Sequence, residues 1–230
     1  MSLETLARET LREREFLLSA PVIRRCLAGE VDRELYVRFL TQAYHHVRHT
    51  VPLLVATADC LPPRHAWLRE ALAHYIAEEE GHDAWILDDI AEAGGDRDAA
   101  AASEPAIPTA AMIAYAWYTV LRGNPVGFFG MVYVLEGTSV ALASRAADSI
   151  QTALGLPSRA FTYLRSHGEL DKEHVGHLSS ILERVTAAED CAAVTRCAKA
   201  IYWLYGHMFR GLESDACGVE DAVSAIRRYA

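Results

Sequence analysis

Two segments of this chain carry acidic and histidine side chains at spacings that suit a metal site. In HYIAEEEGHDAWILDDI, Glu79 and His82 are three residues apart, so within one helix they would share a face. In SHGELDKEHVGHL, Asp171 and His174 repeat this spacing, and His167 lies four residues before Asp171. The second segment would therefore place two imidazoles and a carboxylate on one helical face.

The number of such pairs is not informative by itself. With 31 acidic residues and 10 histidines among 230 residues, about one acid-x-x-His pair arises by chance, and the chain has two. For the second segment the alternative is the exposed, charged start of a helix, with Glu169, Lys172 and Glu173 as neighbours. The spacing alone leaves both interpretations open.

A third segment, PVGFFGMVYVLEGTSVALAS, has Glu136 as its single charged residue. The run lacks flanking positive charge and is diluted by Gly, Ser and Thr, so we expect a helix buried in a bundle rather than a membrane span. An ionised carboxylate in such a helix is costly unless it is paired or binds a metal. The alternative is a structural carboxylate satisfied by an arginine or by hydroxyls.

Taken together, the three segments offer three carboxylates and three imidazoles, a combination that suits two iron ions. These candidate ligands are Glu79, His82, Glu136, His167, Asp171 and His174.

The elements that must position these residues are helices. Apolar residues recur every three or four positions almost throughout, and strict alternation of apolar and polar residues is lacking, so we predict an all-α fold. Asp32 is the expected N-cap of the second helix, in which Pro52 predicts a kink, and residues 94–108 are the expected long loop. The sequence predicts one seven-helix bundle domain over residues 1–230, with helices near 3–18, 32–60, 64–93, 108–122, 125–154, 158–185 and 189–213.

Composition excludes several classes of function. The chain is 51% hydrophobic and 23% charged, as expected of a packed domain, and its net charge of −9 with no Lys/Arg run longer than a pair predicts no nucleic-acid partner. Its five cysteines include no C-x-x-C motif, and its N-terminal segment has no apolar core of a signal peptide. We therefore expect reduced thiols, a cytoplasmic location and no membrane partner.

The order E-x-x-H, then a lone Glu in an apolar helix, then H-x3-D-x2-H resembles the heme-oxygenase-like di-iron oxidases and oxygenases. Their fold is shared by the TenA thiaminases and the PQQ-synthesis oxidase. The resemblance spans about residues 30–215. It implies a heme-oxygenase-like bundle that binds two Fe(II) per chain through the six candidate ligands and uses O2 to oxidise a small organic molecule such as an amine, an amino acid or a fatty acid. It also implies a possible homodimer.

One position departs from the family pattern. Part of the family has its first glutamate seven residues before the histidine, where this chain has Tyr75, so the first ligand is Glu78 or Glu79. We favour Glu79, because the i, i+3 spacing aims both side chains together.

Other candidates have weaker support. His45, His46 and His49 either line a pocket or pack in the core, and Arg48 and Arg210 are possible carboxylate anchors. Two alternative functions stay open: a metal-free TenA- or PQQ-synthesis-like enzyme, and a non-catalytic helical interaction protein. The first is disfavoured because none of the cysteines lies in 64–93 or 125–154, where a nucleophile would be expected.

Overall fold

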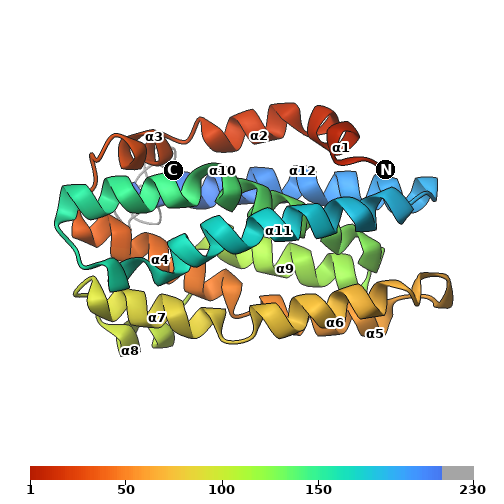
Figure 1. The fold of residues 1–230 in the computed structure, drawn as a ribbon, viewed down its shortest axis with the longest axis horizontal. Coiled ribbons are helices and arrows are strands. Elements are labelled where there is room, and N and C mark those ends of the chain that lie inside the picture. Colours follow the sequence, from red (N-terminus) through yellow and green to blue (C-terminus); the bar gives the residue numbers. More distant parts are fainter. Residues whose placement is uncertain (214–230) are drawn as a thin grey trace, which may run out of the picture.

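The long apolar helix α10 (Phe129–Leu154) is the centre of the bundle (Figure 1). It packs along α11 (Thr162–Arg184) and α12 (Ala188–Gly211), and α12 also contacts α2 and α9. The computed structural model describes residues 1–213, apart from the side chains of Leu170, Lys172 and Glu173. Its described part is all-helical, which confirms the predicted fold class.

The remaining helices cover this centre on two sides. In Figure 1 the N-terminal helices lie along one side, and α5, α6, α7 and α8 lie along the other. Their bounds are α1 (Leu3–Glu9), α2 (Leu11–Leu18), α3 (Pro21–Leu27), α4 (Arg33–Val47), α5 (Thr50–Cys60), α6 (Leu68–Glu79), α7 (His82–Glu92), α8 (Arg97–Ala102) and α9 (Ile107–Leu121). Short 3-10 turns at Pro63–His65, Pro125–Phe128 and Ser158–Phe161 precede α6, α10 and α11.

Local signals set several helix ends as expected. The Asp32 carboxylate caps α4 by accepting the backbone N–H of Leu35 at 2.7 Å. Gly155 ends α10 in the left-handed conformation, with φ of 62°. Asp89, buried in α7, accepts the backbone N–H groups of Thr162 and Tyr163 at 2.9 and 2.8 Å, and so ties the start of α11 to α7.

The described residues form twelve α-helices rather than the predicted seven, because three predicted helices are interrupted and because α3 and α8 lie in segments that were predicted to be loops. The first breaks at Thr10, and the second breaks at Arg48–His49 rather than at Pro52. Pro52 lies in the first turn of α5, where backbone N–H groups have no partner within the helix. The N–H that proline lacks therefore costs no helical hydrogen bond. The predicted long loop 94–108 contains α8, whose N-cap Asp96 accepts the N–H of Ala99.

The third predicted helix breaks between the first two candidate ligands. Gly81 has φ of 87°, a left-handed conformation that ends α6 and starts α7. Glu79 is therefore the last residue of α6 and His82 the first residue of α7. The expectation that they share a face of one helix is wrong, although the turn still brings the two side chains together.

Helix α11 carries the other three histidine and aspartate candidates without interruption. A Cβ at Gly168 would lie 2.3 Å from Ser144 Oγ, so this glycine lets α10 and α11 approach closely. The close approach places α11 beside Glu136 on α10.

The segment Pro125–Leu154 is long and apolar enough to cross a membrane by length and composition. In its most apolar window 61% of the residues are buried inside the bundle, as the sequence predicts for a core helix. The four cysteines of residues 1–213 are free thiols, and Cys217 lies outside the described residues.

We expect Gly81→Ala to lower the free energy of unfolding by about 1 to 2 kcal/mol, because a left-handed backbone is unfavourable for alanine. A Cβ at Gly81 would meet no atom within 4 Å, so the effect is purely conformational. The matched control is Gly176→Ala in α11, which also meets no atom within 4 Å and should add up to about 1 kcal/mol. Urea unfolding measures both, and equal stability of the two variants would contradict the role of the break.

Candidate metal centre

The six candidate ligands come from four helices and face one region of the bundle interior. Glu79 ends α6, His82 begins α7, Glu136 lies in α10, and the other three lie on α11. Five of the six are buried, and the Glu79 side chain is 10% exposed. The alternative of an exposed, charged start for α11 is therefore wrong, because His167, Asp171 and His174 all point inward.

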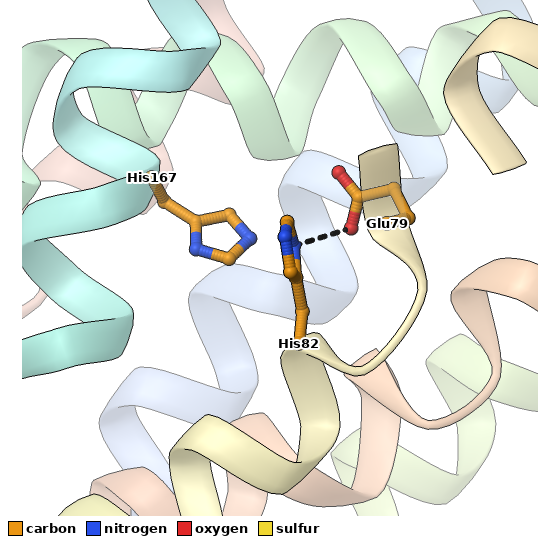
Figure 2. A group of neighbouring side chains, drawn as sticks. All are labelled: Glu79, His82 and His167. Carbon is orange, nitrogen blue, oxygen red and sulfur yellow. Dashed lines mark hydrogen bonds and ion pairs between the residues drawn. The ribbon is translucent and has the colours of Figure 1, made fainter. Parts of the chain in front are cut away.

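Three of these side chains form a first group (Figure 2). Glu79, His82 and His167 each offer a ligand atom within 4.8 Å of the other two. His82 Nδ1 lies 3.1 Å from Glu79 Oε2, and the rings of His82 and His167 meet edge to face at 4.8 Å. Carboxylate and imidazole atoms so placed are the donors that a divalent iron or manganese ion takes.

Contacts outside the first group hold its imidazoles in place. Trp85 stacks on His82 with ring centroids 4.1 Å apart. His167 Nδ1 donates to the backbone carbonyl of Tyr163 at 3.0 Å, which leaves Nε2 as its acceptor nitrogen. A backbone carbonyl on the second ring nitrogen is the usual support of a metal-binding histidine, because it fixes tautomer and orientation.

A second group surrounds His174. Its Nδ1 lies 3.4 Å from Asp171 Oδ1 and 3.5 Å from Glu136 Oε1, while its Nε2 lies 3.0 Å from Glu78 Oε2. The six candidates thus form two neighbouring groups rather than one cluster. Glu78 belongs to the second group and Glu79 to the first, so the side chains of both glutamates face this region.

Burial makes the acids in this region interact strongly. Burial raises the pKa of Glu136 well above its usual range, and the nearby charges of Asp171 and Glu79 raise it further. Glu136 Oε2 is buried without a hydrogen-bond partner. The arginine half of the structural alternative finds no support, because no ion pair joins Glu136 to an arginine in residues 1–213. The hydroxyl half stays open, because the Tyr75 hydroxyl interacts with the Glu136 carboxylate and lowers its pKa.

The other groups show how the acids and imidazoles compensate one another. Burial opposes ionisation of Glu79, but the hydrogen bond with His82 and the charge of His167 hold its pKa below the usual value. Burial lowers the pKa of His167. Burial also works against a charged His174, but the close contact with Asp171 and the charge of Glu78 raise its pKa.

This donor set fits bound divalent cations. Glu136 Oε2 is buried and makes no hydrogen bond, which is costly unless another ligand satisfies it. His174 Nδ1 faces only carboxylates, at 3.4 Å from Asp171 and 3.5 Å from Glu136. Four carboxylates and three imidazoles would supply the charge and the lone pairs for two such ions.

Of the three histidines expected to line a pocket or to pack in the core, His46 is the one that lies at this region. His46 is 2% exposed, has no partner for either ring nitrogen, and lines a cavity of about 70 Å³ together with Glu79, Glu136 and His167. In the sequence, this burial is indicated only by the apolar residues that stand next to His46 in α4. His45, by contrast, borders a separate surface cavity and contacts Ser103.

Neither of the two arginines proposed as substrate anchors lines the cavity at the metal centre. Arg48 is exposed and lies over the ring of Tyr44. Arg210 donates to the backbone carbonyls of Phe16 and Gly206, so the anchor interpretation is wrong for it.

A family model described as "Iron-containing redox enzyme" matches residues 37–206, which include every residue of the two groups. The chain belongs to this family. The description of the family indicates that the chain is an enzyme. A search of the curated proteins finds no match to the chain.

Solved structures show the same fold. A domain of unknown function with a heme oxygenase-like fold from Shewanella denitrificans is 23% identical, with a TM-score of 0.83, and the alignment covers 100% of this chain and 97% of that one. A TenA homologue from Pyrococcus furiosus (13% identity, TM-score 0.72, 92% and 100% covered) is also similar. So is the heme oxygenase from Leptospira interrogans (16% identity, TM-score 0.69, 92% and 100% covered). The heme-oxygenase-like fold is thereby established.

We expect Glu136→Gln to raise the free energy of unfolding of the metal-free protein at pH 8 by about 1 to 2 kcal/mol, because it removes an acid whose ionisation is disfavoured by burial. Since the folded-state pKa is raised, the wild type loses stability as the pH rises from the unfolded-state pKa towards the folded-state pKa, and it loses none once both states are protonated. The gain over wild type should therefore shrink as the pH falls towards 4.

Urea unfolding of both proteins across this pH range measures the effect. Glu183→Gln, at an exposed position of α11, is the control and should show no comparable pH-dependent gain. If Glu136→Gln instead lowers the free energy of unfolding by about 3 kcal/mol, Glu136 is a structural carboxylate whose hydrogen-bond partners lose their acceptor in the variant.

Proposed function

We propose that this protein is a non-heme di-iron oxidase or oxygenase that uses O2 to oxidise a small organic molecule. The observation that carries the proposal is the presence of two adjacent groups of buried carboxylates and imidazoles, with an unsatisfied carboxylate oxygen on Glu136. Membership of a family of iron-containing redox enzymes supports iron as the metal. Two ferrous ions held in this way would supply the electrons and open coordination positions for O2 activation.

The chain's own residues would bind and shield the metals. Glu79, His82 and His167 would hold one ion, and Glu136, Asp171 and His174, with Glu78, would hold the other. Apolar side chains of α5 and α10, among them Leu53, Leu54 and Met131, line the adjoining cavity. They would exclude water from the reacting substrate, which limits loss of oxidising equivalents to solvent.

A hydrolytic, TenA-like function is the alternative that shares the fold. It requires a reactive thiol in a pocket, and Cys26 does line a neighbouring cavity. Burial raises the pKa of the Cys26 thiol to about 11, so the thiol is protonated at neutral pH and is a poor nucleophile. This observation favours the oxidase over the hydrolase.

We also propose that the protein is cytoplasmic and forms a homodimer. The odd, scattered set of five cysteines without a C-x-x-C motif supports a cytoplasmic protein, and the acidic charge of −9 supports the absence of a nucleic-acid partner. We also propose that it has no membrane partner. A homodimer is proposed from the resemblance to the di-iron oxidases alone.

We expect anaerobic titration to load two Fe(II) per chain in the wild type. His82→Ala and Asp171→Ala each remove a donor from a different group, so each should lower the stoichiometry to about one or less and slow O2 consumption on mixing. His207→Ala is the matched control, because this α12 histidine contacts Phe16 and Trp203 instead of the two groups. Iron analysis after desalting gives the stoichiometry, and stopped-flow absorbance follows the reaction with O2.

The same titration distinguishes the two adjacent glutamates. Glu78→Ala and Glu79→Ala should both weaken loading, whereas Glu80→Ala, at the exposed break after α6, should not. Absence of specific iron binding in the wild type, or two irons in both His82→Ala and Asp171→Ala, would overturn the proposal.

A further inference from the structure

A second cavity lies beside the candidate metal centre and is almost wholly apolar. It has a volume of about 80 Å³ and is enclosed by side chains of α3, α4, α10, α11 and α12. Its walls include Val22, Leu35, Phe39, Leu142 and Ile150. No lysine or arginine lines either this cavity or the one at the metal centre. An apolar cavity of this kind favours a hydrocarbon occupant over water.

The two cavities share part of their walls. Ser139, Tyr163 and Tyr205 line both of them, so the apolar cavity adjoins the cavity that contains Glu79, Glu136, His167 and Asp171. A molecule lying across this boundary would have one end among apolar side chains and the other end beside the candidate metal ligands.

The tyrosine hydroxyls at the boundary lie near the metal centre. The Tyr36 hydroxyl, from another wall residue of the apolar cavity, donates to the carbonyl of Ala160 at 2.7 Å. Burial raises the pKa of both Tyr163 and Tyr205, and the charge of Asp171 raises both further, so these two hydroxyls lie within reach of the candidate ligands. Tyrosine hydroxyls both donate and accept hydrogen bonds, so the boundary offers a place for a ligand's polar group.

His46 adds a third group of the same kind. Its ring meets the edge of Tyr205 at 5.7 Å, and neither of its buried nitrogens has a partner. Tyr163, Tyr205 and His46 therefore present two hydroxyls and a neutral imidazole, which can both donate and accept hydrogen bonds.

We propose that the substrate of this protein is an amphiphile with an aliphatic body. The body occupies the apolar cavity, and a hydrogen-bonding end group lies at Tyr163, Tyr205 and His46, where it faces the metal centre. This proposal rests on the proposed oxidase function for its reaction, but the binding step itself needs no metal. The apolar walls of the cavity exclude a substrate with a charged group along its body, because that charge would be buried without a partner.

Binding is tested with cis-parinaric acid, a fluorescent alkenoic acid whose emission rises in apolar surroundings, and with octanol, octanoate and octylamine as competitors. Wild-type protein should bind the probe with and without Fe(II). Ala146→Phe fills the apolar cavity from α10 and should weaken probe binding by about tenfold or more. Ala143→Leu is a smaller change in the same cavity and should weaken binding in the same direction.

Ala114→Phe is the matched control, because Ala114 lines the separate surface cavity beside His45 and should leave binding unchanged. Tyr163→Phe and Tyr205→Phe remove only the hydroxyls, so they should change the order in which the three competitors displace the probe. That order also identifies which end group the boundary prefers.

Iron stoichiometry is measured on the same samples, because Ala143 and Ala146 do not line the metal cavity. Probe binding that is absent in the wild type, or equal in Ala146→Phe, Ala143→Leu and Ala114→Phe, would overturn the inference even if two irons bind. Probe binding without any iron binding would overturn the oxidase function and leave the apolar binding site in place.

Discussion

Four carboxylates and three imidazoles converge inside an apolar bundle, and the rest of the structure is arranged around that concentration of charge. Coulomb repulsion between buried acids is strong, because the surrounding protein screens charge far less than water does. Glu136 shows the effect most clearly, since its pKa is raised both by burial and by its acidic neighbours. Such an arrangement is stable only if protons, imidazolium ions or metal ions supply positive charge.

Two backbone features make this convergence possible. The left-handed Gly81 ends α6 and lets Glu79 and His82 approach each other from two helices. Gly168 allows α10 and α11 to pack closely, and Glu136 on α10 lies 3.5 Å from His174 on α11. The remaining contacts orient the donors, as the Tyr163 carbonyl does for His167. A site built on four helices is held more precisely than one built on loops.

The apolar side chains around the centre have two effects. They strengthen electrostatic interactions inside the site by excluding water, and they leave two joined cavities for a substrate. The boundary between these cavities carries neutral hydrogen-bonding groups instead of charges. Both arginines that the sequence suggested as anchors are engaged elsewhere, so recognition at this site depends on shape and neutral polar contacts.

Local sequence patterns were sufficient for the fold class and for most ligand candidates. Helical periodicity, the Asp32 cap and the Gly155 stop are interactions between near neighbours in the chain, so the sequence predicts α4 and the end of α10 correctly. The break at Gly81 was missed because a single glycine is tolerated within a helix and the packing of α6 and α7 decides whether the chain turns there.

By itself, the sequence determined that an all-α bundle would bury Glu136 on an apolar helix and that His167, Asp171 and His174 would share one face of another. Only the tertiary structure decided that Glu78 and Glu79 serve different groups, that His46 faces the centre while His45 does not, and that Tyr163 and Tyr205 join two cavities. These outcomes depend on the approach of helices far apart in the chain, and residue spacing carries no information about which faces meet.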